Sequence, residues 1–234
     1  MRRLSVDTLW TPELINTVGW FDASDASTIT ESSNNVSQWD DKSGNGNNLV
    51  QLSSSNQPSY ATGQINGVSA LVFKDATETV EYLDIETDYA NFEWVAIVLT
   101  STAVRFSQAC GSQTLGSGAN YTIQYRGDTS PDRWQNPYYT NGNPISILGA
   151  SAILGAGAIA INDNLALTDF DFNVGSDRGI EGRGWDGAIG EVICGGTTLD
   201  TATRETIEGY LAHKWGFVSD LPALHPYKSV PPLA

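Results

Sequence analysis

The sequence has few of the residues on which many enzyme active sites depend. Its 234 residues include two histidines, two cysteines and one methionine. Catalysis by a Ser/His/Asp arrangement would have to use His213, at the end of a predicted helix, or His225, in a proline-rich tail. GxSxG, P-loop and HExxH motifs are absent, so the hydrolase, NTPase and zinc-protease classes have no motif to support them. We therefore expect a protein that is not an enzyme.

Cysteine is too scarce to form a disulfide framework. Cys110 and Cys194 are far apart in the sequence and do not form a CxxC motif. Buried free thiols are the expectation, and a disulfide between the two cysteines is the alternative.

Positive charge is also scarce. The chain has 12 Lys and Arg against 27 Asp and Glu, which gives a formal net charge of -15. Phosphate backbones and anionic membrane surfaces would repel such a protein, so we expect no nucleic-acid partner. The N-terminal segment MRRLSVDTLW lacks the apolar run of a signal peptide or membrane anchor, so we expect synthesis in the cytoplasm and no membrane insertion.

Short strand patterns separated by turn residues are abundant. Turns are predicted at residues 43–47, 66–67, 126–128 and 141–144, which are rich in Gly, Asn and Asp. The type of the apolar segment 149–161 is ambiguous from its periodicity. Eight segments have the composition and spacing of strands: 18–21, 36–39, 69–73, 82–85, 93–99, 121–125, 170–174 and 188–194.

One amphipathic helix is predicted at about residues 200–215. Asp200 is suited to cap its N-terminus, and Gly216 to end it. Its apolar positions follow helical spacing: Ile207, Tyr210, Leu211 and Trp215. The prolines beyond it predict an extended C-terminal tail. We expect an N-terminal arm, residues 1–16, followed by a single domain, residues 17–234, with Trp20, Trp39, Trp94 and Trp215 in its core.

Three pairs of segments resemble laminin-G-like, concanavalin A-like jelly-roll modules of bacteriophage structural proteins and secreted bacterial proteins. These are residues 19–25 with 36–47, residues 58–73 with 82–85, and residues 185–193 with 207–216. The resemblance covers both ends of the chain and weakens between about residues 100 and 165. It implies an all-β fold, a two-sheet antiparallel jelly-roll sandwich with one C-terminal helix. The resemblance implies that sugars or proteins often bind at the rim or concave face of such a sandwich, and it implies no single activity.

The candidate binding segment is the loop GDTSPDRWQNPYYTNGNP, residues 127–144. Exposed aromatic side chains next to polar groups are typical of contact surfaces. A protein interface, a glycan site and internal packing of the aromatics are all compatible with this composition. The candidate contact residues are Asp132, Arg133, Trp134, Asn136, Tyr138, Tyr139 and Asn141.

A weaker candidate is a calcium loop. Asp41, Ser43 and Asn45 have the spacing of alternate oxygen ligands, and Gly46 would allow the sharp turn. The twelfth position is Leu52, where a calcium loop has a bidentate Glu. Such residues are also common in ordinary turns. We expect no cofactor, with a structural calcium ion as the open alternative.

Taken with the resemblance, these features predict a non-enzymatic bacteriophage structural protein at the virion surface. A capsid decoration protein or a head or tail fibre component would bind other virion proteins, as a homo-oligomer or attached to the capsid. The alternative is a carbohydrate-binding module that recognises a host-surface or environmental polysaccharide.

Overall fold

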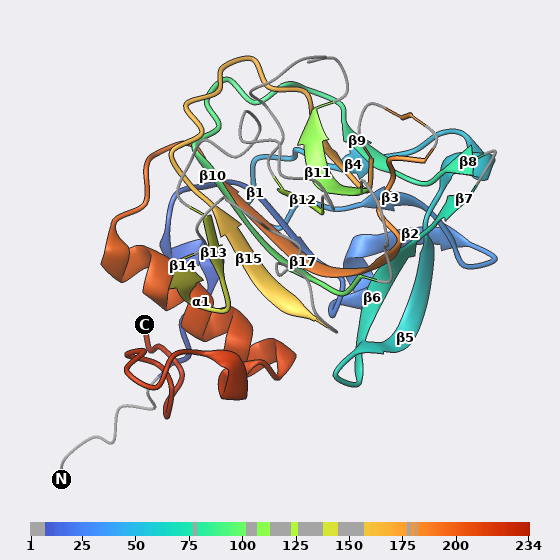
Figure 1. Ribbon diagram of the computed structural model, residues 1–234. Coiled ribbons are helices and arrows are strands. Elements are labelled where there is room, and N and C mark those ends of the chain that lie inside the picture. The colour runs from blue at the N-terminus through green and yellow to red at the C-terminus, as the bar shows by residue number, and fades with distance from the viewer. Residues whose placement is uncertain are drawn as a thin grey trace, which may run out of the picture.

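The computed structural model describes residues 8–76, 79–101, 107–112, 123–125, 138–144, 157–176, 179–180 and 182–234. Within these ranges the protein is mostly antiparallel β-sheet with a single α-helix near the C-terminus (Figure 1). None of the described helices is long and apolar enough to cross a membrane.

Within the described ranges, seventeen strands and one α-helix are defined. The strands are β1 (Thr17–Asp22), β2 (Ile29–Ser32), β3 (Asn35–Trp39), β4 (Leu49–Val50), β5 (Ser59–Ile65), β6 (Val68–Phe73), β7 (Asp75–Ala76), β8 (Thr79–Val80), β9 (Leu83–Ile85), β10 (Trp94–Leu99), β11 (Ser107–Ser112), β12 (Ile123–Tyr125), β13 (Tyr138–Thr140), β14 (Asn143–Pro144), β15 (Ala158–Asn162), β16 (Phe172–Val174) and β17 (Gly187–Gly195). The helix is α1 (Thr201–Trp215), and short 3-10 turns are η1 (Pro12–Leu14), η2 (Ala26–Thr28), η3 (Ser54–Asn56) and η5 (Val218–Asp220).

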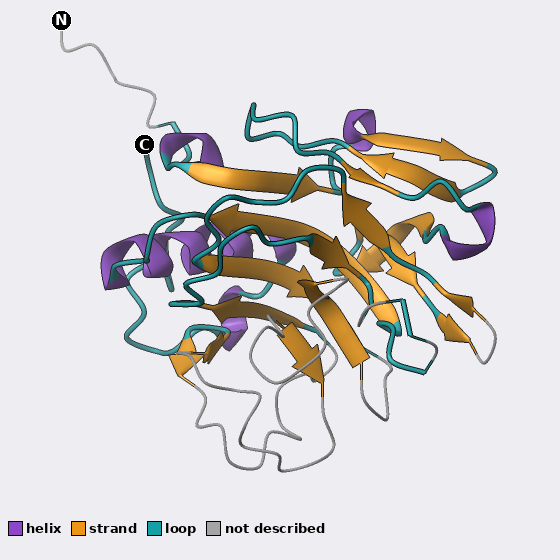
Figure 2. Ribbon diagram, turned by 90° about the horizontal axis from the view of Figure 1, so that it is seen from above, coloured by secondary structure: helices purple, strands orange, loops and turns teal. Residues whose placement is uncertain are grey.

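Fifteen of the described strands form one continuous hydrogen-bonded path, and β7 and β8 pair separately with each other. Its order is β12-β11-β16-β9-β4-β3-β5-β6-β17-β10-β15-β13-β14, with β1 beside β17 and β2 beside β3. All its pairings are antiparallel. Seen from above, the strands lie in successive layers with α1 to one side (Figure 2). Each of the eight predicted strand segments overlaps one of these strands, and β15 occupies the end of the ambiguous segment 149–161.

Two hydrophobic clusters lie on opposite faces of the central strands. In β10, Val95, Ile97 and Leu99 belong to the first cluster, whereas Trp94, Ala96 and Val98 belong to the second. This follows from strand geometry, because successive side chains point to opposite faces of a sheet. The first cluster receives side chains from β3, β4, β9, β11 and β16 as well as from β6, β10, β15 and β17. The second is closed by α1.

The tryptophans predicted as core residues are buried. Trp39 and Trp215 are fully inaccessible, and Trp20 and Trp94 are nearly so. Trp39 lies in the first cluster, and the other three lie in the second, between the sheet and α1.

The predicted helix is confirmed, beginning one residue later than expected. The Asp200 side chain accepts a hydrogen bond from the Thr203 backbone N–H at 2.7 Å, which satisfies one of the free donors of the first turn. Gly216 ends the helix in the left-handed conformation, with φ of 78°. Ile207, Leu211 and Trp215 are buried against the sheet.

The N-terminal arm pairs with the C-terminal tail. Leu9 and Leu233 form an antiparallel bridge, flanked by hydrogen bonds from Trp10 N to Pro232 O and from Ala234 N to Thr8 O. Trp10 is 7% exposed and belongs to the second cluster, with its ring edge-on to Tyr210 on α1. The arm and tail therefore cover one end of that cluster together.

Candidate functional site

The predicted binding loop is described only at its C-terminal end. Asp132, Arg133, Trp134 and Asn136 lie outside the described residues, so their assignment stays a prediction. For Tyr138 the prediction of a contact role is wrong, because its side chain is 3% exposed and belongs to the first hydrophobic cluster. The internal-packing interpretation applies to this residue. It follows from strand alternation in β13, which turns Tyr138 toward the core.

Tyr139 and Asn141 are engaged within the chain. The guanidinium of Arg204, on α1, lies 4.0 Å from the centroid of the Tyr139 ring. The Asn141 side chain accepts a hydrogen bond from Ile159 N at 2.8 Å, and Asn141 and Gly142 both have positive φ, which makes a tight hairpin turn. Both residues therefore stabilise the junction of β13, β14, β15 and α1.

The predicted calcium loop is a hydrogen-bonded turn. Asp41 accepts from the backbone N–H groups of Trp20, Ser43 and Asn47 and from the Ser43 hydroxyl. The Asn45 amide donates to Thr17 O and to the Ser43 hydroxyl. These bonds engage the Asp41 carboxylate and the Ser43 hydroxyl within the turn itself, so the geometry favours the ordinary-turn interpretation. Across the described ranges, no three His, Cys, Asp or Glu side chains cluster closely enough to hold a metal ion.

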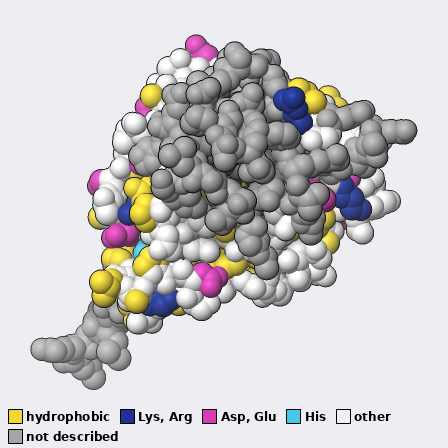
Figure 3. Space-filling view, in the orientation of Figure 1, with side chains coloured by type: hydrophobic (Ala, Val, Ile, Leu, Met, Phe, Trp, Pro, Cys, Tyr) yellow, Lys and Arg dark blue, Asp and Glu magenta, His cyan; other side chains and the backbone are white. Residues whose placement is uncertain are grey.

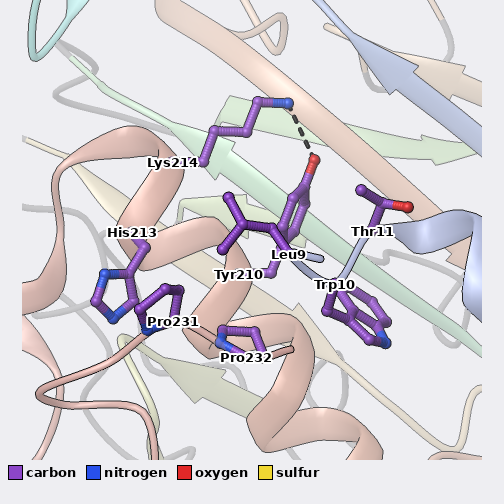
Figure 4. Close-up of a pocket in the computed structure, with 8 residues that line it drawn as sticks. All are labelled: Leu9, Trp10, Thr11, Tyr210, His213, Lys214, Pro231 and Pro232. Atoms are coloured by element: carbon purple, nitrogen blue, oxygen red, sulfur yellow. Dashed lines mark hydrogen bonds between the residues drawn. The ribbon is translucent and has the colours of Figure 1, made fainter. Parts of the chain in front are cut away.

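An apolar pocket of about 310 Å³ lies where the N-terminal arm, α1 and the C-terminal tail meet. Figure 4 shows its lining: Leu9, Trp10, Thr11, Tyr210, His213, Lys214, Pro231 and Pro232. The aromatic rings of Trp10 and Tyr210 stand 5.5 Å apart at an angle of 67°. The accessible surface inside the pocket is almost entirely apolar.

The titratable groups around this pocket are already bonded. In Figure 4, Lys214 points toward the Tyr210 hydroxyl, 3.1 Å away. Its ammonium group also contacts the carboxylates of Asp22 and Glu191. His213 Nε2 lies 2.8 Å from the carbonyl oxygen of Tyr227 in the tail. With these groups engaged, the pocket offers apolar contact more than hydrogen bonding.

Apolar side chains continue outside the pocket. Leu9 is 59% exposed and Leu233, its bridge partner, is 51% exposed. Figure 3 shows hydrophobic side chains gathered at the lower left, over the region of α1 and the C-terminal tail. Apolar surface that adjoins a pocket is typical of a protein-binding site.

Behind the pocket lies a fully buried carboxylate, Glu191 of β17. Its oxygens accept hydrogen bonds from the indole N–H groups of Trp20 at 2.8 Å and Trp215 at 2.6 Å, and from the Tyr210 hydroxyl at 2.8 Å. The Lys214 ammonium lies 2.7 Å from Glu191 Oε2. Four donors from β1 and α1 thus converge on one side chain.

A β-bulge in β17 orients the Glu191 side chain toward α1. Val98 of β10 pairs with Glu191 and Leu99 pairs with Ile189, so Gly190 is an extra residue between the two pairs. A Cβ on Gly190 would lie 2.6 Å from the Trp215 ring, so glycine leaves the space that this indole fills. The bulge therefore brings both Glu191 and Trp215 into position.

Asp22 of β1 extends this buried network. Its Oδ2 lies 2.8 Å from Lys214 Nζ and 3.2 Å from Lys42 Nζ, and its Oδ1 accepts from the backbone and hydroxyl of Ser24. Burial opposes the charge, but the two lysines and Ser24 outweigh it and lower the pKa of Asp22. Burial raises the pKa of Glu191, and Lys214 offsets this only in part.

Sequence reasoning missed Glu191 as a functional candidate. A signal was present, because a single Glu preceded by Gly interrupts the otherwise apolar segment AIGEVIC, residues 188–194. A charged residue within a buried strand needs a partner, and a break in the two-residue period indicates a bulge. The identity of the partner, Lys214, depends on the docking of α1.

Comparisons of the chain with protein-family models, with curated proteins and with solved structures give no match.

Proposed function

We propose that this chain is a non-enzymatic structural protein of a bacteriophage virion, a capsid decoration protein or a head or tail fibre component. The proposed scaffold is a two-sheet jelly-roll sandwich. In its support, strands from both halves of the hydrogen-bonded path, such as β3 and β16 on one side and β10 and β17 on the other, contribute to one hydrophobic cluster. The resemblance of the outer segments to phage jelly-roll modules supports the same assignment.

The observation that carries the proposal is the apolar pocket between the N-terminal arm and the C-terminal tail. A glycan site needs several polar groups free to bond hydroxyls, together with an aromatic face. At this pocket Lys214 and His213 are bonded to the chain itself, and Leu9 and Leu233 extend the apolar surface outward. An apolar anchor from another virion protein fits this chemistry better than a sugar does.

The test is incorporation of a variant into particles. Leu9→Asp places a charge at the mouth of the pocket, and the fold should persist because the Leu9 side chain is 59% exposed. We expect fewer copies of this variant in purified particles than of the wild-type chain. Leu52→Asp is the matched control, because Leu52 is 93% exposed and follows β4, away from the pocket.

Two results would contradict the proposal. If Leu9→Asp and Leu52→Asp were incorporated equally, the pocket would not be the surface that contacts the virion. Affinity for a soluble polysaccharide, lost in Trp134→Ala and retained in Leu9→Asp, would support the carbohydrate-binding alternative instead.

A further inference from the structure

Three side chains with complementary reactivity meet behind the pocket. Lys214 Nζ lies 2.8 Å from Asp22 Oδ2 and 2.7 Å from Glu191 Oε2. Glu191 is fully buried, and the side chain of Asp22 is 6% exposed. The amine is thus held against one carboxyl group, which can supply the acyl carbon of an amide, and against a second, which can accept a proton.

We propose that Lys214 and Asp22 condense to an intramolecular isopeptide bond, with Glu191 as the catalytic residue that moves the proton. The bond would be a covalent modification of this chain, and it does not depend on the proposed virion role. The reaction needs no cofactor or oxidant, because an ammonium and a carboxylate give an amide and one water molecule.

The steps balance in atoms and charge. The Lys214 ammonium first gives one proton to Asp22 Oδ2, which leaves a neutral amine beside a neutral carboxylic acid. The nitrogen lone pair attacks Cγ of Asp22, and the carbonyl electron pair moves to Oδ1. Glu191 takes a second proton from the nitrogen and delivers it to Oδ2. The Cγ–Oδ2 bond breaks, Oδ2 leaves as water, and one hydrogen stays on the amide nitrogen.

Neighbouring groups suit each step. The Ser24 backbone N–H and hydroxyl donate to Asp22 Oδ1 at 3.0 Å and 2.6 Å, where negative charge develops during the attack. Burial raises the pKa of Glu191, which strengthens this carboxylate as a base. The lowered pKa of Asp22 makes the ion pair the resting form, so the first proton transfer is the uphill step.

The fixed positions of the three side chains lower the entropic cost of the reaction. The indoles of Trp20 and Trp215 and the hydroxyl of Tyr210 fix the Glu191 carboxylate, and β1, β17 and α1 fix the three backbones. Reactants held in this way behave as though at very high concentration. The product would tie β1 to the last turn of α1.

Intact mass spectrometry of the purified full-length chain, before and after prolonged incubation at neutral pH, tests the inference. The expected mass is that of the sequence less one water molecule. Trypsin should then release residues 4–42 joined to residues 205–228, because Lys214 would no longer be a cleavage site. A mass equal to that of the unmodified sequence at both times would overturn the proposal.

Variants distinguish this bond from other losses of water. Lys214→Arg removes the nucleophile and Glu191→Gln removes the base, and both should have the full, unmodified mass. Lys228→Arg is the matched control and should still lose water. Lys228 donates to the carbonyl groups of Val218, Ser219 and Leu221, in and just after η5, away from the Asp22–Lys214–Glu191 group. Loss of water that persists in Lys214→Arg would also overturn the proposal.

Discussion

Replacing Arg204 by Met should strongly destabilise the junction of helix, tail and sheet. Arg204 Nη1 lies 2.5 Å from Oε1 of Glu208, which is fully buried, and only 11% of the Arg204 side chain is exposed. Methionine keeps helix propensity and much of the apolar volume, so the change acts mainly on the charge. Glu208 would keep its hydrogen-bond contact with His225 Nε2, 3.1 Å away.

The expected loss of unfolding free energy in Arg204→Met is the sum of two contributions. Removing one partner of a buried ion pair costs about 3 to 5 kcal/mol, and the residual exposure of Arg204 favours the lower figure. Losing the cation–π contact with Tyr139, at 4.0 Å, adds about 0.5 to 1 kcal/mol. The sum, about 4 kcal/mol, is a large part of the roughly 5 to 15 kcal/mol that stabilises a typical domain.

Urea unfolding followed by tryptophan fluorescence at neutral pH measures this loss. Arg204→Lys, which keeps the charge without the planar guanidinium, should lose less. Adding Glu208→Gln to Arg204→Met should recover part of the stability, because no unpaired charge would then be buried. A loss below about 1 kcal/mol in Arg204→Met would refute the reasoning that this ion pair holds the junction together.

Two further predictions concern a titrating carboxyl group and the β-bulge. Burial raises the pKa of Glu81 from 4.5 to about 7, although the hydrogen bond from Lys74 N acts in the opposite direction. The protonated Glu81 side chain therefore contributes fully to stability below pH 4.5, and this contribution is lost as the pH rises to about 7. In Glu81→Gln this fall should disappear from unfolding free energies measured across that range, and an unchanged pH profile would contradict the assignment. Gly190→Ala should destabilise the protein by about 1 to 3 kcal/mol, because the new methyl group would overlap the Trp215 ring. Chemical denaturation measures that loss, and an unchanged midpoint would show that the indole has room to move.

Local sequence signals were sufficient to predict many of the helices and strands. Asp200 and Gly216 bracket α1 because capping and left-handed termination depend on single residues. Strands with many β-branched and aromatic residues, such as β10, were also found. Strand β5, sequence SYATGQI, was missed because it is polar and lacks alternation. Its place between β3 and β6 depends on the hairpin at Asn66 and Gly67.

The candidate functional surface was harder to predict for a physical reason. The mixed composition of residues 127–144 indicated a contact loop, yet Tyr138 belongs to the core because β13 pairs with β15, a long-range contact. The apolar pocket combines residues near both ends of the chain, and the Asp22–Lys214–Glu191 group combines β1, α1 and β17. No local pattern specifies such contacts, because they depend on how distant elements pack.

The most direct test of the proposed function is quantitative mass spectrometry of purified phage particles from the source, with the copy number of this chain measured against the major capsid protein. The proposal predicts that the chain is present, in copy numbers near those of the capsid protein for a decoration protein or in few copies for a fibre. Complete absence from intact particles would contradict the virion assignment and favour a free carbohydrate-binding module.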